Sequence, residues 1–189
     1  MLRIAALAGL VFATSATTAE AQSSPVGAAV EAGILACSKW VLEPKTWSTN
    51  ETDFANAIGL AERLRPIGGL PPGVLPEAMS AALDRFWILD AGSGNGVFVA
   101  ASSSKPVCNV IGGGASDYEP EVEGLLVSPN FTALWTSHDH HLEGDMVTDT
   151  YMYATDKKAQ FVVSRADQPA ARTDRVQFLA TLFYEIGNF

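Results

Sequence analysis

The residue types that could do chemistry gather in one stretch, residues 137–149, which reads SHDHHLEGDMVTD. It holds all three histidines of the chain, His138, His140 and His141, together with four acidic residues. Imidazole nitrogens and carboxylate oxygens are ligands that zinc and copper take in proteins. A bound metal with one position open to water would also allow hydrolysis. The stretch therefore raises the hypothesis of a metal site.

A β-hairpin would set the geometry of this candidate site. If residues 142–145 form the turn, His138 lies opposite Asp149 on the neighbouring strand. Because strand side chains alternate between faces, His140 then shares one face with His138 and Asp149. The sequence thus predicts a metal set of His138, His140 and Asp149, with zinc or copper as the candidate cofactor. A shift of one residue in the register would separate both histidines from Asp149.

The same residues also fit a polar hairpin tip that binds no metal. Exposed turns commonly carry polar side chains, and the chain has no further histidine to complete a tetrahedral site. Asp139 or Glu143 would have to supply the missing ligand. Both interpretations stay open at this point.

In the same predicted register, Tyr151 and Tyr153 share a face with the two histidines. We expect the helices to cover the other face of the sheet and to leave this one open. Aromatic side chains on an open sheet face are suited to contact a partner. Tyr151 and Tyr153 are therefore the predicted binding surface.

The first residues indicate where the chain folds. The segment MLRIAALAGLVFATSATTAEAQSS starts with a single positive charge at Arg3, continues with an apolar run, and reaches the small-residue sequence AEA. The apolar run of about 13 residues is shorter than the ~20 that span a bilayer. We expect residues 1–21 to be a signal peptide that is removed, which leaves no membrane insertion. The mature chain would then be periplasmic or secreted.

Two cysteines, Cys37 and Cys108, are the only ones in the chain. An oxidising compartment favours a disulfide between them, worth about 4 kcal/mol of stability on the chain-entropy model. Two separate buried thiols are the alternative. A catalytic cysteine is disfavoured because no histidine lies near either cysteine in the sequence.

The net charge of −9 disfavours nucleic acid as a partner, because an acidic surface repels phosphate backbones. Two glycine-rich stretches, GSGNG and IGGGASD, do not complete either of the common phosphate-loop patterns. No stretch assembles a nucleophile with a base, so we assign no catalytic residues.

Hydrophobic periodicity divides the mature chain into a helical segment, residues 22–85, and a β-rich portion, residues 86–189, of one domain. Val26, Val30, Ile34, Cys37 and Trp40 recur at helical spacing and predict a buried stripe on the first helix. A second helix is expected to start near Ser48 and to end before Pro66. A third is expected to start at Pro76.

The β-rich portion alternates short runs of strand-forming residues with turn signals. The pattern predicts two units of three strands followed by a helix, spanning residues 86–128 and 131–186, with the last helix starting near Thr173. A duplication within the chain would explain this order, and so would chance. We expect an α+β fold with a single antiparallel sheet of about six strands and helices on one face.

Three short motifs carry a resemblance to known proteins. They are CSKWV from Cys37, FWIL from Phe86 and VCNV from Val107. In these motifs, which spread over residues 37–111, the chain resembles small exported proteobacterial proteins of unknown function. The resemblance implies an envelope or secreted location and a Cys37–Cys108 bridge, and it carries over no catalytic residues.

These observations together favour an exported, non-enzymatic binding or interaction module. Its partner would be an envelope protein or a small ligand. A metal-binding protein that uses His138, His140 and Asp149 is the alternative.

Overall fold

In the computed structural model, residues 23–144, 146–167 and 176–185 are described. The expected signal peptide, residues 1–21, lies outside them. The described residues form one eight-stranded antiparallel sheet with the strand order β1-β2-β3-β4-β8-β7-β6-β5. The predicted α+β class with a single antiparallel sheet is confirmed, although the sheet has eight strands rather than about six.

The helices are short apart from the first. They are α1 (Pro25–Leu42), the 3-10 helix η1 (Pro44–Ser48), α2 (Glu51–Ala57), α3 (Glu77–Ser80), α4 (Glu119–Leu126) and α5 (Pro129–Leu134). The strands are β1 (Leu64–Pro66), β2 (Arg85–Asp90), β3 (Asn95–Ala101), β4 (Val107–Gly114), β5 (Trp135–Glu143), β6 (Met146–Tyr153), β7 (Ala159–Ala166) and β8 (Phe178–Tyr184).

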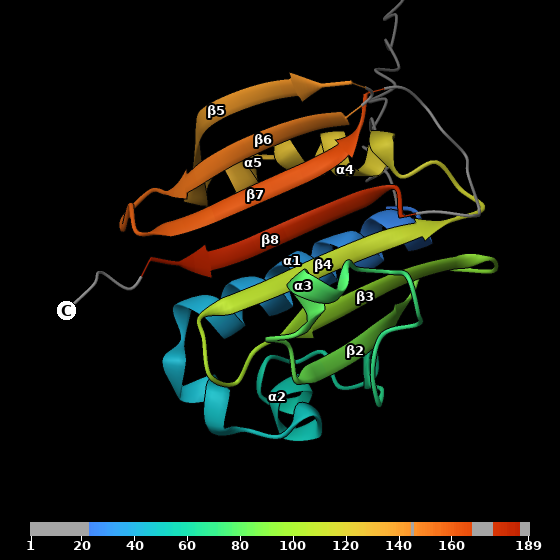
Figure 1. Ribbon diagram of the computed structural model, residues 1–189, viewed down its shortest axis with the longest axis vertical. Coiled ribbons are helices and arrows are strands. Elements are labelled where there is room, and N and C mark those ends of the chain that lie inside the picture. The colour runs from blue at the N-terminus through green and yellow to red at the C-terminus, as the bar shows by residue number, and fades with distance from the viewer. Residues whose placement is uncertain (1–22, 145, 168–175, 186–189) are drawn as a thin grey trace, which may run out of the picture.

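The sheet consists of two four-stranded meanders, β1–β4 and β5–β8, which meet where β4 pairs with β8. Figure 1 shows α1, α4 and α5 behind the sheet and α3 in front of it. The long helix α1 runs behind the centre of the sheet, where it packs mainly on β3, β4 and β8. α1 therefore packs against strands of both meanders.

The sequence accounts well for α1. Ser24 caps it by accepting a hydrogen bond from the Gly27 N–H, and Pro25 occupies the first turn, where its missing N–H costs nothing. The predicted stripe is buried along its whole length: Val26, Val30, Ile34, Cys37, Trp40 and Val41. α1 has the length and composition of a membrane span, but over half of it is buried within this fold.

The predicted disulfide joins Cys37 on α1 to Cys108 on β4, with the two Cα atoms 5.3 Å apart. Beside it, the rings of Trp40, Phe54 and Trp87 meet with centroid separations of 5.0 to 5.6 Å. The Trp40 indole N–H donates to the Ser102 carbonyl at 2.9 Å, so the buried polar atom has a partner. The bridge and this aromatic cluster fix α1 against the first meander.

The predicted last helix is wrong, because residues 178–184 form strand β8 between β4 and β7. Its side chains alternate, with Phe178, Ala180 and Leu182 buried on the side of α1. An apolar run this short fits both the helical and the strand period. Residues 178–184 form a strand because they can pair with β4 on one side and β7 on the other. The second half of the chain therefore does not repeat the strand–strand–strand–helix order of the first.

The second and third predicted helices are shorter than expected. α2 is capped by Asn50 rather than started near Ser48, and it ends at Ala57. Leu64, expected on the second helix, begins the edge strand β1. α3 has four residues, none of them buried.

The expectation that all helices cover one face also needs correction. The segment 67–84, which includes α3, lies on the opposite face from α1 (Figure 1). There Leu83 packs with Ala100 of β3 and Ile111 of β4, with Leu70, Val74, Leu75 and Phe98 around them. Both faces of the first meander are therefore covered, at least in part.

Candidate functional site

The hairpin of β5 and β6 has a shorter turn than predicted. Pairing begins at Glu143 and Met146, so residues 142 and 143 belong to the strand. Gly144 in the turn has a φ of 64°, a left-handed value that glycine adopts without a side-chain clash. This register places His140, and not His138, opposite Asp149. His138 lies at a β-bulge between Ser137 and Asp139.

Asp149 binds two partners with its two carboxylate oxygens. Its Oδ1 lies 2.6 Å from His140 Nδ1, and its Oδ2 accepts a hydrogen bond from Arg165 at 2.5 Å. Arg165 also donates to Glu123 on α4, which ties the second meander to the helix layer. Burial of Arg165 disfavours its charge, but the hydrogen bonds that it donates to Asp149 and Glu123, together with the charges of these carboxylates, outweigh burial and raise its pKa.

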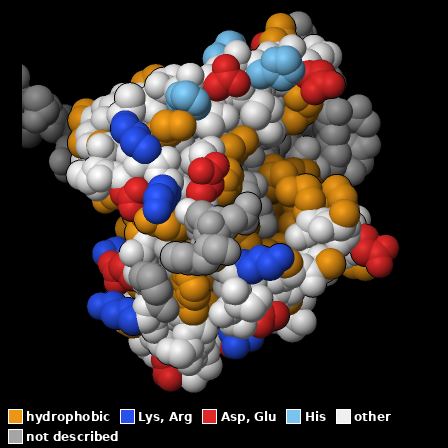
Figure 2. Space-filling model, turned by 60° about the vertical axis from the view of Figure 1, so that its left-hand side comes forward, with side chains coloured by type: hydrophobic (Ala, Val, Ile, Leu, Met, Phe, Trp, Pro, Cys, Tyr) orange, Lys and Arg blue, Asp and Glu red, His pale blue; other side chains and the backbone are white. Residues whose placement is uncertain are grey.

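The predicted metal set is only partly brought together. His140 and Asp149 are in direct contact. The His140 Nδ1 and the Asp149 Oδ1 therefore bind each other, and a metal ion would have to displace this hydrogen bond to reach them. Within the described ranges, no group of three or more His, Cys, Asp or Glu side chains is placed to hold a metal ion. Figure 2 shows the three histidines at the surface at the upper end of the molecule, with acidic side chains near them.

Tyr151 and Tyr153 do not lie on an open sheet face, contrary to the expectation. Both pack against the main core on the helix-covered side. The Tyr151 ring meets Phe131 of α5 edge-on at 5.0 Å, and the Tyr153 ring meets Trp135 at 5.3 Å. Burial raises the pKa of Tyr151. Tyr151 pairs with Phe161 of β7, which is fully buried in the main core, so the face of β6 that carries both tyrosines is the one turned toward the core.

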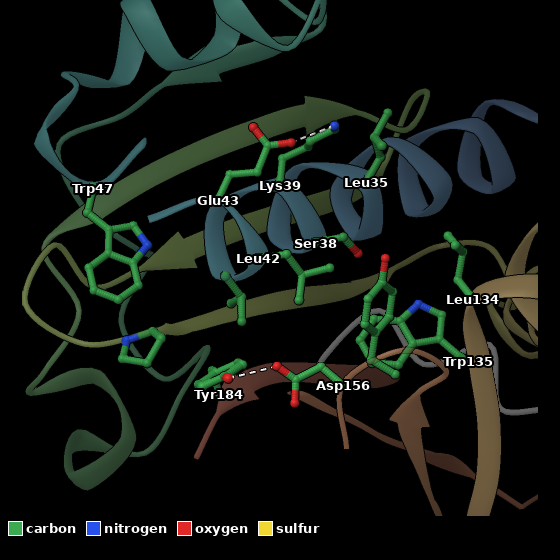
Figure 3. A pocket seen from close by; sticks show the side chains of 13 residues that line it. Leu35, Ser38, Lys39, Leu42, Glu43, Trp47, Leu134, Trp135, Asp156 and Tyr184 are labelled. Atoms are coloured by element: carbon green, nitrogen blue, oxygen red, sulfur yellow. Dashed lines mark hydrogen bonds and ion pairs between the residues drawn. The ribbon is translucent and has the colours of Figure 1, made fainter. Parts of the chain in front are cut away.

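Tyr153 nevertheless lines a groove of about 810 Å³ next to the C-terminal half of α1. Figure 3 shows Leu42 and Ser38 of α1 on one wall, and Tyr184 of β8 with Asp156 on the other. Trp47 of η1 closes one end of the groove, and Trp135 with Leu134 closes the other. The volume lies in the range of pockets that bind small organic molecules.

The walls of this groove are mainly apolar and partly exposed. Leu35 of α1 is 43% exposed and Leu134 at the end of α5 is 47% exposed. Exposed large apolar side chains that gather around a concavity are typical of binding surfaces, whereas scattered ones are not. Four aromatic residues also line the groove: Trp47, Trp135, Tyr153 and Tyr184.

Hydrogen bonds hold the groove walls in place. The Trp47 indole N–H donates to the Trp40 carbonyl at 2.7 Å, which anchors one end of the groove to the core helix. At the other end, the Ala154 N–H donates to the Leu134 carbonyl at 2.8 Å. A ligand would thus meet a largely pre-formed site, which lowers the entropic cost of binding.

The polar groups of the groove are few and lie toward its rim. Lys39 Nζ and Glu43 form a pair on α1 at 2.8 Å, and the hydrogen bond from Lys39 lowers the pKa of Glu43. Asp156 accepts a hydrogen bond from the Tyr184 hydroxyl at 2.7 Å, which lowers the pKa of Asp156 and raises that of Tyr184. Ser38 adds one hydroxyl to the α1 wall.

The sequence did not predict the groove because its residues come from α1, η1, α5, β5, β6, β8 and the connecting segments between elements. The only signal available was local: Leu35 and Leu42 lie on α1 outside the predicted buried stripe.

A scan against protein-family models, a search of curated proteins and a search of solved structures each found no match for this chain. The resemblance to small exported proteins therefore stays a prediction.

Proposed function

We propose that this protein is an exported binding module whose groove beside α1 holds a small, mainly apolar ligand. The observation that carries the proposal is the groove itself: a pre-formed concavity of about 810 Å³ with exposed leucines and aromatic walls. Natural ligand pockets share this combination of apolar lining and a few placed polar groups.

Export is the second part of the proposal. It rests on the apolar N-terminal sequence that ends in AEA and on the Cys37–Cys108 bridge, which an oxidising compartment maintains. Mass spectrometry of the protein recovered from a periplasmic fraction tests it. We expect a chain that starts at Gln22 and has no free thiol; an intact Met1 terminus with two thiols would contradict export.

The binding part is tested with the neutral fluorescent probe N-phenyl-1-naphthylamine, whose emission rises in apolar surroundings. We expect saturable binding of one probe molecule per chain. Ser38→Trp places a large ring into the groove from α1 and should abolish probe binding while the protein stays folded.

Leu142→Ser is the matched control. Leu142 is 54% exposed on the β5–β6 hairpin, outside the groove, so this variant changes an exposed side chain without altering the groove. This variant should bind the probe as the wild type does. Equal probe binding in Ser38→Trp and the wild type would show that the groove is not the site.

A further inference from the structure

Asp156 is the one carboxylate on the groove wall that has no ion pair among the described residues. Its two oxygens accept hydrogen bonds from the Tyr184 hydroxyl at 2.7 Å and from the Lys158 backbone N–H at 3.1 Å. These bonds orient the carboxylate. The Lys158 ammonium also attracts it, but the two groups form no ion pair. Asp156 stands in the turn between β6 and β7, next to Tyr184 in Figure 3.

Among the described residues that line the groove, Lys39 is the one cation, and it already has an anionic partner. Its ammonium lies 2.8 Å from Glu43, and Lys45 approaches the same carboxylate at 3.7 Å. A ligand anion would have to compete with Glu43 for Lys39. A ligand cation meets a carboxylate without a salt bridge, on a chain whose net charge of −9 attracts cations.

The aromatic walls point to the same ligand chemistry. The faces of aromatic rings carry partial negative charge and attract ammonium groups within about 6 Å of the ring centre. Trp135 and Tyr153 meet at a centroid distance of 5.3 Å, and both line the groove together with Asp156 and Tyr184. Aromatic rings beside a carboxylate are a combination that binds organic ammonium ions.

Building on the proposed function, we infer that the groove selects an organic cation: an ammonium group attached to an aromatic or alkyl body. The apolar body lies between the leucines of α1 and the ring of Trp135. The ammonium group lies at Asp156, where the Tyr184 hydroxyl holds the carboxylate in place. Glu43 keeps Lys39 from repelling the ligand.

Three probes of nearly equal shape test this inference by displacement of N-phenyl-1-naphthylamine: 2-(1-naphthyl)ethylammonium, 2-(1-naphthyl)ethanol and 1-naphthylacetate. We expect the ammonium compound to bind about fivefold more tightly than the alcohol, and the acetate to bind most weakly. The preference should decrease with added salt, because the carboxylate is solvent-accessible.

The variant Asp156→Asn should bring the ammonium and the alcohol to equal affinity, while the affinity for the alcohol stays as in the wild type. Asp139→Asn is the matched control, because it removes one negative charge from the exposed strand β5, outside the groove. Its ammonium preference should equal that of the wild type.

The outcomes separate this inference from the proposed function. If no probe binds, the proposed function is overturned together with the inference. If the alcohol or the acetate binds as tightly as the ammonium compound, the groove binds ligands but does not select cations. If Asp156→Asn retains the full preference, the assignment of Asp156 as the charged contact is overturned.

Discussion

The β5–β6 hairpin and the groove beside α1 use their polar side chains in opposite ways. On the hairpin, both oxygens of Asp149 are bound, one by His140 and the other by buried Arg165. In the groove, Asp156 has hydrogen bonds but no ion pair among the described residues, and two leucines of the groove wall are exposed. Residue types that suggest chemistry can thus serve stability, whereas ordinary leucines and tryptophans build the concave site.

We expect the largest change in stability from a substitution in the hydrogen-bond network of His140, Asp149 and Arg165. Asp149→Ala leaves the Arg165 guanidinium, only 9% exposed, without its buried partner and should destabilise the fold by about 3 kcal/mol. Urea unfolding followed by tryptophan fluorescence measures this change. Asp139→Ala, on the exposed side of the same hairpin, is the control and should change stability little.

The double variant Asp149→Leu with Arg165→Met tests whether the loss comes from the unpaired charge. Replacing both partners with apolar side chains of similar size should recover most of the stability. A double variant as unstable as Asp149→Ala would mean that the network does more than neutralise Arg165.

Substitutions in the groove should weaken ligand binding and leave stability almost unchanged. Leu35→Ser combined with Leu134→Ser removes two exposed apolar side chains and should weaken N-phenyl-1-naphthylamine binding about tenfold. Because both leucines are more than 40% exposed, the free energy of unfolding should change by less than about 1 kcal/mol. A large loss of stability without a loss of binding would erase the difference between the two regions.

Zinc titration probes the hairpin directly. Because His140 Nδ1 and Asp149 face each other and His138 lies at the bulge, we expect no calorimetric signal of zinc binding tighter than about 10 μM. Micromolar or tighter binding that disappears in His138→Ala would show that the hairpin binds a metal ion and would favour the metal hypothesis.

The smallest expected effect is one of pH on ligand selection. The hydrogen bonds from Tyr184 and from the Lys158 backbone keep the pKa of Asp156 below its usual range, so the carboxylate stays charged in mildly acidic solution. The preference for the ammonium compound should therefore be the same at pH 7 and pH 5. It should disappear only at pH values below the usual pKa of an aspartate. Displacement titrations at the two pH values measure it; a marked loss by pH 5 would exclude Asp156.

The parts of this fold that the sequence predicts are those decided locally. The buried stripe of α1 extends over the whole helix, and β2, β3 and β4 form in the three runs of strand-forming residues that the sequence predicts as strands. The parts it misses are decided by distant neighbours. Residues 178–184 become a strand because β4 and β7 lie on either side of them.

The candidate sites illustrate the same limit. A hairpin turn two residues shorter than assumed was enough to exchange His138 for His140 opposite Asp149. The groove needs side chains of α1, η1, α5, β5, β6 and β8 at once, and no local sequence pattern predicts how those elements meet. Only the assembled sheet and its helices bring them together.

The most direct test of the central claim is a crystal structure of the mature protein with 2-(1-naphthyl)ethylammonium bound. We expect the naphthyl group to lie between Leu42 and Trp135, with the ammonium nitrogen within about 4 Å of the Asp156 carboxylate. Density for the probe in the smaller hollow on the opposite face, near Met79, Leu83 and Phe183, with the groove beside α1 empty, would contradict it.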